Sequence, residues 1–180
     1  MANKSHNRIS SIKNGRSHLR NSHEEIKSML VQHFQGIEKE TTANREHFIR
    51  DLTRHIPRLV SREDNFNLNK PVTEEEVNEA VKEMRNGKAP GPDGFNVDFF
   101  KACWSIVKQD IINAVEDSRM NRTIPKALNT SFISLIPKQD NAQTLYRFRP
   151  IALCNVVYKI ISKFLANRLK PLLPTLMCVE

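Results

Sequence analysis

The sequence predicts an α+β fold that is mostly helical and contains one short β-hairpin. Apolar residues recur at helical spacing in several long stretches of the chain. Only Ser131–Ile136 combines β-branched and apolar residues over a short run, as a strand does. With 180 residues, of which 39% are hydrophobic and 27% charged, the chain is long enough to build one hydrophobic core.

The N-terminal part is expected to be a flexible basic arm at Met1–Asn21, followed by a helix. Ser22 and Glu25 have the spacing of a capping box, and apolar residues follow them at intervals of three and four. The helical pattern then weakens, and a short second helix around Phe48–Leu59 is interrupted by a proline. We interpret residues 22–68 as a helical connector.

The next helix is predicted for Thr73–Asn86. Thr73 and Glu76 again have capping-box spacing, and Gly87 is placed to end the helix. Beyond it, aromatic residues at helical spacing predict two helices, or one bent helix, that reach Asn121. We expect these aromatic side chains in the core rather than on a surface that stacks nucleic-acid bases. They are Phe95, Phe99, Phe100 and Trp104.

The C-terminal part is expected to contain the hairpin and a last helix. Pro137 closes the first strand, and Tyr146–Leu153 is interpreted as the returning strand. The helix is predicted for Asn155–Lys170 and should stop at Pro171. Its buried face should consist of Val157, Ile160, Ile161, Phe164, Leu165 and Leu169.

The charge distribution points to a polyanionic partner. The formal net charge is +8, and Lys and Arg are concentrated in Met1–Ser22 and Ser131–Lys170. A basic surface of this kind favours nucleic acid, with an ordinary solvated surface as the alternative. The chain has no apolar run of membrane-spanning length and no N-terminal secretion signal. We therefore expect an intracellular protein of the nucleus or cytoplasm that is neither secreted nor bound to a membrane.

Metal binding and acid–base catalysis find no support in the sequence. The histidines lack H-E-x-x-H spacing, and the run Glu74–Glu76 suits the first turn of a helix. Cys103, Cys154 and Cys178 form no C-x-x-C pair and are interpreted as free thiols of a reducing compartment. We predict no catalytic residue and no metal ligand.

The block Lys88–Phe95 predicts a tight turn, because its prolines preset φ and its glycines permit positive φ. Backbone amides exposed beside Lys88 could meet a phosphate. The alternative is a purely structural turn between two helices.

The hairpin carries the best candidates for ligand chemistry. Lys138 lies just past the first strand, and Arg147 and Arg149 enter the second. Antiparallel pairing would bring them within reach of one triphosphate, which Arg binds by bidentate donation and Lys as a point charge. Strand alternation would place both arginines on one face and Phe148 on the other. The alternative is that these are ordinary solvated cations.

Five blocks of the chain, taken together and in this order, carry a resemblance. They are Asn69–Val77, Lys88–Phe95 with Val97–Trp104, Leu135–Lys138, Phe148–Leu153 and Tyr158–Lys170. Their order and spacing resemble the reverse transcriptase of plant LINE-type (non-LTR) retrotransposons. The resemblance implies that residues 69–180 are a fragment of the fingers subdomain, truncated before the palm.

The resemblance also implies site residues and partners. The glycine-bearing block would lie along the RNA template, and two hairpin cations would meet the triphosphate of the incoming dNTP. In such an RNA-directed DNA polymerase, palm aspartates hold two Mg²⁺ ions that act on the DNA primer. Those aspartates are missing from the chain, so we expect the fragment alone to be inactive. The implied template residues are Lys88, Gly91, Asp93 and Gly94, and the implied nucleotide residues are Lys138 and Arg149.

Two other interpretations remain open at the level of the sequence. The chain could be a small basic nucleic-acid-binding remnant without polymerase activity, for which RNA binding should depend steeply on salt. It could also be similar to a mobile-intron maturase, although Phe148–Leu153 fits that family less well.

Overall fold

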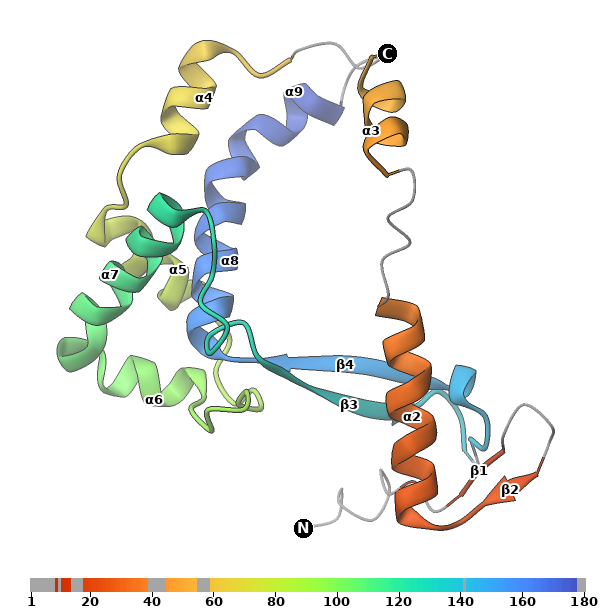
Figure 1. Cartoon of the computed structure of the whole chain (residues 1–180). Helices are drawn as coiled ribbons and strands as arrows, with labels where there is room; N and C mark the ends of the chain where they lie inside the picture. Colours follow the sequence, from red (N-terminus) through yellow and green to blue (C-terminus); the bar gives the residue numbers. More distant parts are fainter. Residues whose placement is uncertain are drawn as a thin grey trace. The chain divides into compact units, whose positions relative to one another are not determined.

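A computed structural model describes Ile9 and residues 11–13, 18–38, 45–54, 59–140 and 142–177. Within these residues it is mostly helical with two small antiparallel hairpins, which confirms the α+β class (Figure 1). The chain forms two compact units. The first comprises residues 1–57 and 133–151, and the second comprises residues 58–132 and 152–180.

The second unit is a helical body with one apolar core. Val77 and Val81, Phe100, Val115 and Phe164 are among the side chains buried together there. Its helices are α4 (Arg62–Asn69), α5 (Glu74–Glu83), α6 (Val97–Ala102), α7 (Trp104–Asn121), α8 (Val156–Leu169) and α9 (Leu173–Met177). The core is therefore built from segments that are far apart in sequence.

Helix α5 begins as the sequence predicts and ends earlier. The Thr73 hydroxyl accepts from the Glu76 amide, and the Glu76 carboxylate accepts from the Thr73 amide, which confirms the capping box. The helix ends at Glu83, however, and not at Gly87. Lys101 accounts for the early end, because its ammonium donates to the carbonyls of Lys82 and Met84 and so satisfies acceptors that a further turn would have used.

The aromatic stretch forms two helices, α6 and α7, which meet at Cys103. Phe100 is buried, and Trp104 packs against the core while its indole N–H donates to Asn78. The expectation that all four aromatic side chains lie in the core is wrong for Phe95 and Phe99, which are 46% and 38% exposed. Their rings instead lie against each other, with centroids 4.5 Å apart at the rim of the core.

Helix α8 buries a narrower face than its apolar pattern suggests. Ile160 and Phe164 are buried as predicted, whereas Leu165 and Leu169 are 46% and 44% exposed. Helix α8 ends at Leu169, just before Pro171 as predicted, and Lys170–Leu172 then forms a 3₁₀ turn that leads into α9. Proline is tolerated there because the first turn of a helix needs no amide donor.

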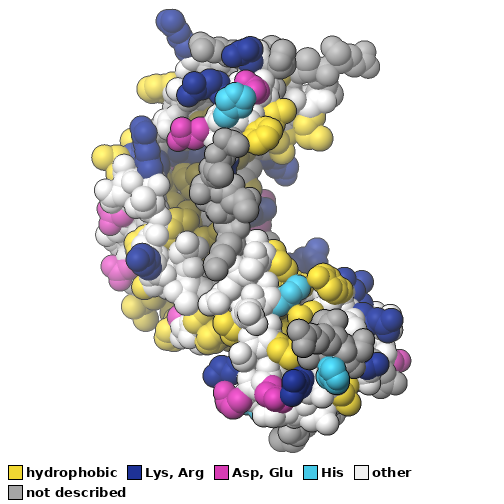
Figure 2. Space-filling model, turned by 45° about the vertical axis from the view of Figure 1, so that its right-hand side comes forward, with side chains coloured by type: hydrophobic (Ala, Val, Ile, Leu, Met, Phe, Trp, Pro, Cys, Tyr) yellow, Lys and Arg dark blue, Asp and Glu magenta, His cyan; other side chains and the backbone are white. Residues whose placement is uncertain are grey.

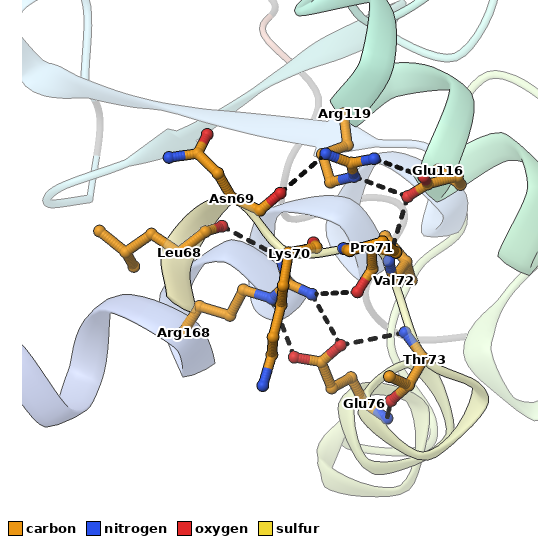
Figure 3. Close-up of polar contacts among 10 residues, drawn as sticks. All are labelled: Leu68, Asn69, Lys70, Pro71, Val72, Thr73, Glu76, Glu116, Arg119 and Arg168. Atoms are coloured by element: carbon orange, nitrogen blue, oxygen red, sulfur yellow. Dashed lines mark hydrogen bonds and ion pairs between the residues drawn. The ribbon is translucent and has the colours of Figure 1, made fainter. Parts of the chain in front are cut away.

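Within the second unit, two arginines hold the segment Leu68–Thr73 against helices α7 and α8 (Figure 3). Arg168 is 7% exposed and donates to both carboxylate oxygens of Glu76 at 2.8 Å, and also to the carbonyls of Leu68, Lys70 and Pro71. Its guanidinium carbon lies 4.4 Å from the centre of the Phe164 ring. The charge-assisted hydrogen bonds of Arg168 therefore fix the path of the irregular segment Leu68–Thr73.

The second arginine, Arg119, acts on the same segment from α7. It pairs with Glu116 and donates to the Asn69 carbonyl at 2.9 Å, while the Glu116 carboxylate accepts from the Val72 amide at 3.1 Å. The Arg119 guanidinium, together with the Val72 amide, lowers the pKa of Glu116 from 4.5 to about 2. The hydrogen bonds from Arg168 likewise lower the pKa of Glu76.

The depressed pKa of Glu116 makes folding sensitive to acid. Between about pH 4.5 and 2 the folded carboxyl binds fewer protons than the unfolded one, so the free energy of unfolding falls as the pH falls through this window. We expect Glu116→Gln to lose less stability than the native protein between pH 5 and pH 2.5, measured by urea unfolding at each pH. Glu75→Gln, at an exposed position of α5, is the matched control. An unchanged pH slope in Glu116→Gln would contradict this assignment.

The first unit has its own small core. Ile12, Ile26 and Phe148 are buried in it, and Leu135 and Leu145 pack against them. It contains β1 (Ile12–Lys13) paired with β2 (Leu19–Arg20), then α2 (His23–Glu38), α3 (Arg45–Arg54) and most of the β3–β4 hairpin. Strand β3 spans Ser131–Pro137 and β4 spans Phe148–Cys154, so both strands lie close to their predicted positions.

The N-terminal predictions have mixed outcomes. Helix α2 starts directly after Ser22, as expected, but Glu25 accepts from Arg20 at 3.0 Å. The expected short second helix is α3. Helix α4 was not predicted, although Ser61 and Asp64 form a complete capping box. Most of the arm Met1–Asn21, the proline at 57 and Cys178 lie outside the described residues.

The part of the chain that the structure describes includes no helix with both the length and the hydropathy needed to cross a membrane. Cys103 and Cys154 are free and partly buried.

Candidate functional site

The glycine-bearing block Lys88–Phe95 is a loop that lies against the start of α8. Gly91 is buried, and a β-carbon at this position would come within 2.4 Å of the Asn155 side-chain oxygen and 2.5 Å of its backbone nitrogen. Gly94 has a φ of +79°, which only glycine adopts without strain. Both glycines are thus explained by the local backbone, one by close approach and the other by its dihedral angle.

Asn155 joins three segments of the second unit. It is 2% exposed, and its side-chain oxygen accepts from the Asp93 amide at 3.2 Å. Its side-chain nitrogen donates to the carbonyls of Ala127 and Leu128. The hydrogen bonds of this buried side-chain amide therefore connect the loop Lys88–Phe95, the turn at Ala127 and Leu128, and the start of α8.

These contacts limit what the loop can offer a ligand. The amides of Asp93, Gly94 and Phe95 donate to Asn155, to the Gly91 carbonyl and to the Asp93 carboxylate. A phosphate could therefore bind these amides only if the loop rearranged. Of the expected template residues, Lys88 keeps an exposed side chain that can meet a polyanion, whereas Gly91 is covered.

The other candidate residues lie at the end of the β3–β4 hairpin where the chain turns from β3 into β4, in the first unit. The Lys138 amide donates to the Arg147 carbonyl at 2.8 Å, and the Lys138 ammonium donates to the Tyr146 carbonyl at 2.8 Å. Antiparallel pairing thus places Lys138 opposite Arg147. Arg149 is exposed on β4 while its neighbour Phe148 is buried, as strand alternation requires.

One detail of the hairpin differs from the expectation. Arg147 is not a strand residue, because Leu145–Arg147 forms a 3₁₀ turn in which the Arg147 amide donates to the Thr144 carbonyl at 2.9 Å. The prediction that strand alternation places Arg147 and Arg149 on one face is therefore wrong, because only Arg149 belongs to a strand. Arg147 is nevertheless exposed, so the hairpin end presents three cationic side chains.

On the face shown in Figure 2, Lys and Arg side chains are spread out and interspersed with carboxylates. Among the residues covered by the structure, no three His, Cys, Asp or Glu side chains gather in a way that would hold a metal ion. The exposed cations of the hairpin end are suited to the recognition of anions.

Two residues of these sites were not expected from the sequence. Asn155 was expected only to open a helix, and its role as a link between segments depends on partners 62 and 28 residues away. Tyr146 was assigned only to a strand. Its side chain is 79% exposed, which is unusual for an aromatic residue beside a core. The sequence does not reveal this exposure, because it depends on the 3₁₀ turn Leu145–Arg147.

Fold and site together define a mostly helical α+β protein with an ordered glycine loop and a hairpin that ends in exposed cations. No protein-family model matches the chain. The chain is similar to the transposon TX1 uncharacterized 149 kDa protein of Xenopus laevis, with 29% identity over 115 residues. The match covers 64% of the chain and 9% of that protein, so the chain spans only a small part of its relative's length.

Proposed function

We propose that the chain is part of the RNA-directed DNA polymerase of a LINE-type retrotransposon and serves as its fingers segment, holding RNA template and incoming dNTP. Lys138 and Arg149 contact the triphosphate, and Lys88 contacts the template backbone. The polymerase reaction itself, with its DNA primer and Mg²⁺ ions, belongs to the whole enzyme.

The observation that carries this proposal is the exposed cationic end of the hairpin. Lys138, Arg147 and Arg149 lie on two adjoining segments whose backbones are hydrogen-bonded to each other, so their charges can act on one anion. The similarity to a transposon protein supports the same class of function. The loop Lys88–Phe95 supports it less directly, because most of its polar groups serve the fold.

The Lys138 ammonium can bind a phosphate and keep its present partner. It donates to the Tyr146 carbonyl at 2.8 Å, and an ammonium group has three N–H donors. A phosphate oxygen is the stronger acceptor, because the hydrogen bond is then between two charged groups. The proposal therefore needs no rearrangement of the backbone.

The test is RNA binding across a salt series. We expect Lys138→Ala/Arg149→Ala to bind single-stranded RNA more weakly than the native chain, because in the absence of dNTP the phosphates of RNA can occupy the triphosphate position that these two cations form. The slope of log affinity against log salt should also fall, by about one unit for each phosphate that the variant no longer neutralises. The control is Arg62→Ala/Lys126→Ala, which removes the same charge from exposed positions outside the hairpin.

Equal affinity and slope for the hairpin and control variants would contradict the proposal. Competition by dNTP separates the nucleotide role from general RNA binding. If dNTP fails to displace RNA from the native chain while the hairpin variant still weakens RNA binding, the chain is better described as a small basic nucleic-acid-binding protein.

A further inference from the structure

We propose that the hairpin end binds single-stranded nucleic acid by stacking one unpaired base on the ring of Tyr146, between the cations that hold the adjoining phosphates. This inference rests on the proposed function and adds a base contact to its phosphate contacts. It assigns a ligand-binding role to a side chain that the core does not use.

The local backbone explains why Tyr146 points outward. In a 3₁₀ turn, residues three apart lie on the same side. Leu145 packs against the small core and Phe148, three residues later, is buried in it. Tyr146 and Arg147, between these two anchors, are consequently left outside, and Tyr146 is 79% exposed.

The position of the ring is held from several sides. The Tyr146 carbonyl accepts from the Lys138 ammonium, and the next residue is tied to the Lys138 amide and to the Thr144 carbonyl. The His33 ring of α2 lies 5.5 Å from the Tyr146 ring, centre to centre, at 88°. An edge-to-face contact of this kind supports a ring while leaving most of its surface accessible.

An exposed aromatic ring flanked by cations matches the chemistry of single strands. Proteins that bind them combine positive side chains along the backbone with aromatic rings on which bases stack. Arg147 follows the ring directly, Lys138 donates to the Tyr146 carbonyl, and Arg149 is exposed nearby on β4. A duplex, in contrast, keeps its bases paired and stacked inside, so it offers no base to this ring.

The experiment compares Tyr146→Ala and Tyr146→Phe in the full chain, with oligo(rU), oligo(dT) and an abasic strand of equal length as probes. We expect Tyr146→Ala to weaken binding of oligo(rU), oligo(dT) or both by about fivefold to a hundredfold, with an unchanged salt slope. Tyr146→Phe should bind like the native chain, and the abasic strand should not distinguish the three proteins. Loss on RNA alone would identify RNA as the source of the base, and loss on DNA alone would identify DNA.

A second readout follows the ring itself. In Tyr146→Trp, we expect the added tryptophan fluorescence to be quenched by oligo(rU) or oligo(dT) and not by the abasic strand. Phe66→Trp is the matched control, because Phe66 is a 73% exposed aromatic residue of α4, outside the hairpin. Its fluorescence should respond to none of the three probes.

The outcomes separate the two proposals. Native binding of oligo(rU) and oligo(dT) by Tyr146→Ala, or an equal loss on the abasic strand, would overturn stacking. If Lys138→Ala/Arg149→Ala still lowers affinity and slope in that case, the phosphate contacts of the proposed function stand without it. If neither variant changes binding, or the native chain does not bind single strands, both proposals fail.

Discussion

Phe164→Ala is expected to lower the free energy of unfolding of the second unit by about 3–5 kcal/mol, the usual loss for removing a buried aromatic side chain. Phe164 is 1% exposed at the centre of the core, and its ring also supports the Arg168 guanidinium. The substitution therefore leaves a cavity and weakens the contact that orders Leu68–Thr73. Trp104, the single tryptophan, packs against the same core, so its fluorescence during urea unfolding measures the loss.

Leu165→Ala is the matched control, since the adjacent residue on α8 is 46% exposed. We expect it to cost less than about 1 kcal/mol, because little apolar surface is buried there. Similar losses for the two variants would mean that the face of α8 has been assigned incorrectly.

Gly91→Ala is expected to destabilise the second unit by about 3 kcal/mol, at the upper end of the range for overpacking. The new β-carbon would lie 2.5 Å from the Asn155 backbone nitrogen and 2.6 Å from the Cys154 carbonyl carbon. Both are backbone atoms at the junction between β4 and α8, so they cannot move aside as the tip of a side chain can. The loop must separate from the helix, which breaks the hydrogen bond between Asp93 and Asn155.

The control within the same loop is Gly94→Ala. Gly94 has open space around it and differs only in its positive φ, so we expect a loss of about 1–2 kcal/mol from backbone strain. Urea unfolding of both variants, followed by Trp104, gives the comparison. A loss for Gly91→Ala no greater than for Gly94→Ala would contradict the close approach to Asn155.

Elements with strong local signals could be predicted from the sequence. The capping box at Thr73 confines the start of α5, and the change from helical spacing to β-branched residues locates β3. Signals of this kind act within a few residues, so no knowledge of distant contacts is needed. The paired strands Ile12–Lys13 and Leu19–Arg20 could not be found in this way, because two residues are too few to show a period.

What could not be predicted depends on contacts between distant segments. The end of α5 depends on Lys101, which lies 17 residues beyond the carbonyl of Met84 to which it donates. The exposure of Leu165 shows that an apolar stripe on a helix does not define how much of it is covered.

For the candidate site, the sequence predicted the residue types but not the local conformation. The cationic residue types of the hairpin could be identified, because charge is visible in a sequence. The 3₁₀ turn that directs Tyr146 outward and the fully satisfied side chain of Asn155 could not, because each depends on how two segments pack.

The two arginines hold the segment Leu68–Thr73 through its backbone carbonyls rather than through its side chains. Arg168 and Arg119 donate to four of its backbone carbonyls, and a carbonyl is present whichever side chain the residue carries. Mutational tolerance should therefore be high at the exposed positions 69 and 70 and low at the two arginines. A library that randomises positions 69 and 70 should keep the path of the segment, whereas one that randomises positions 119 and 168 should lose it.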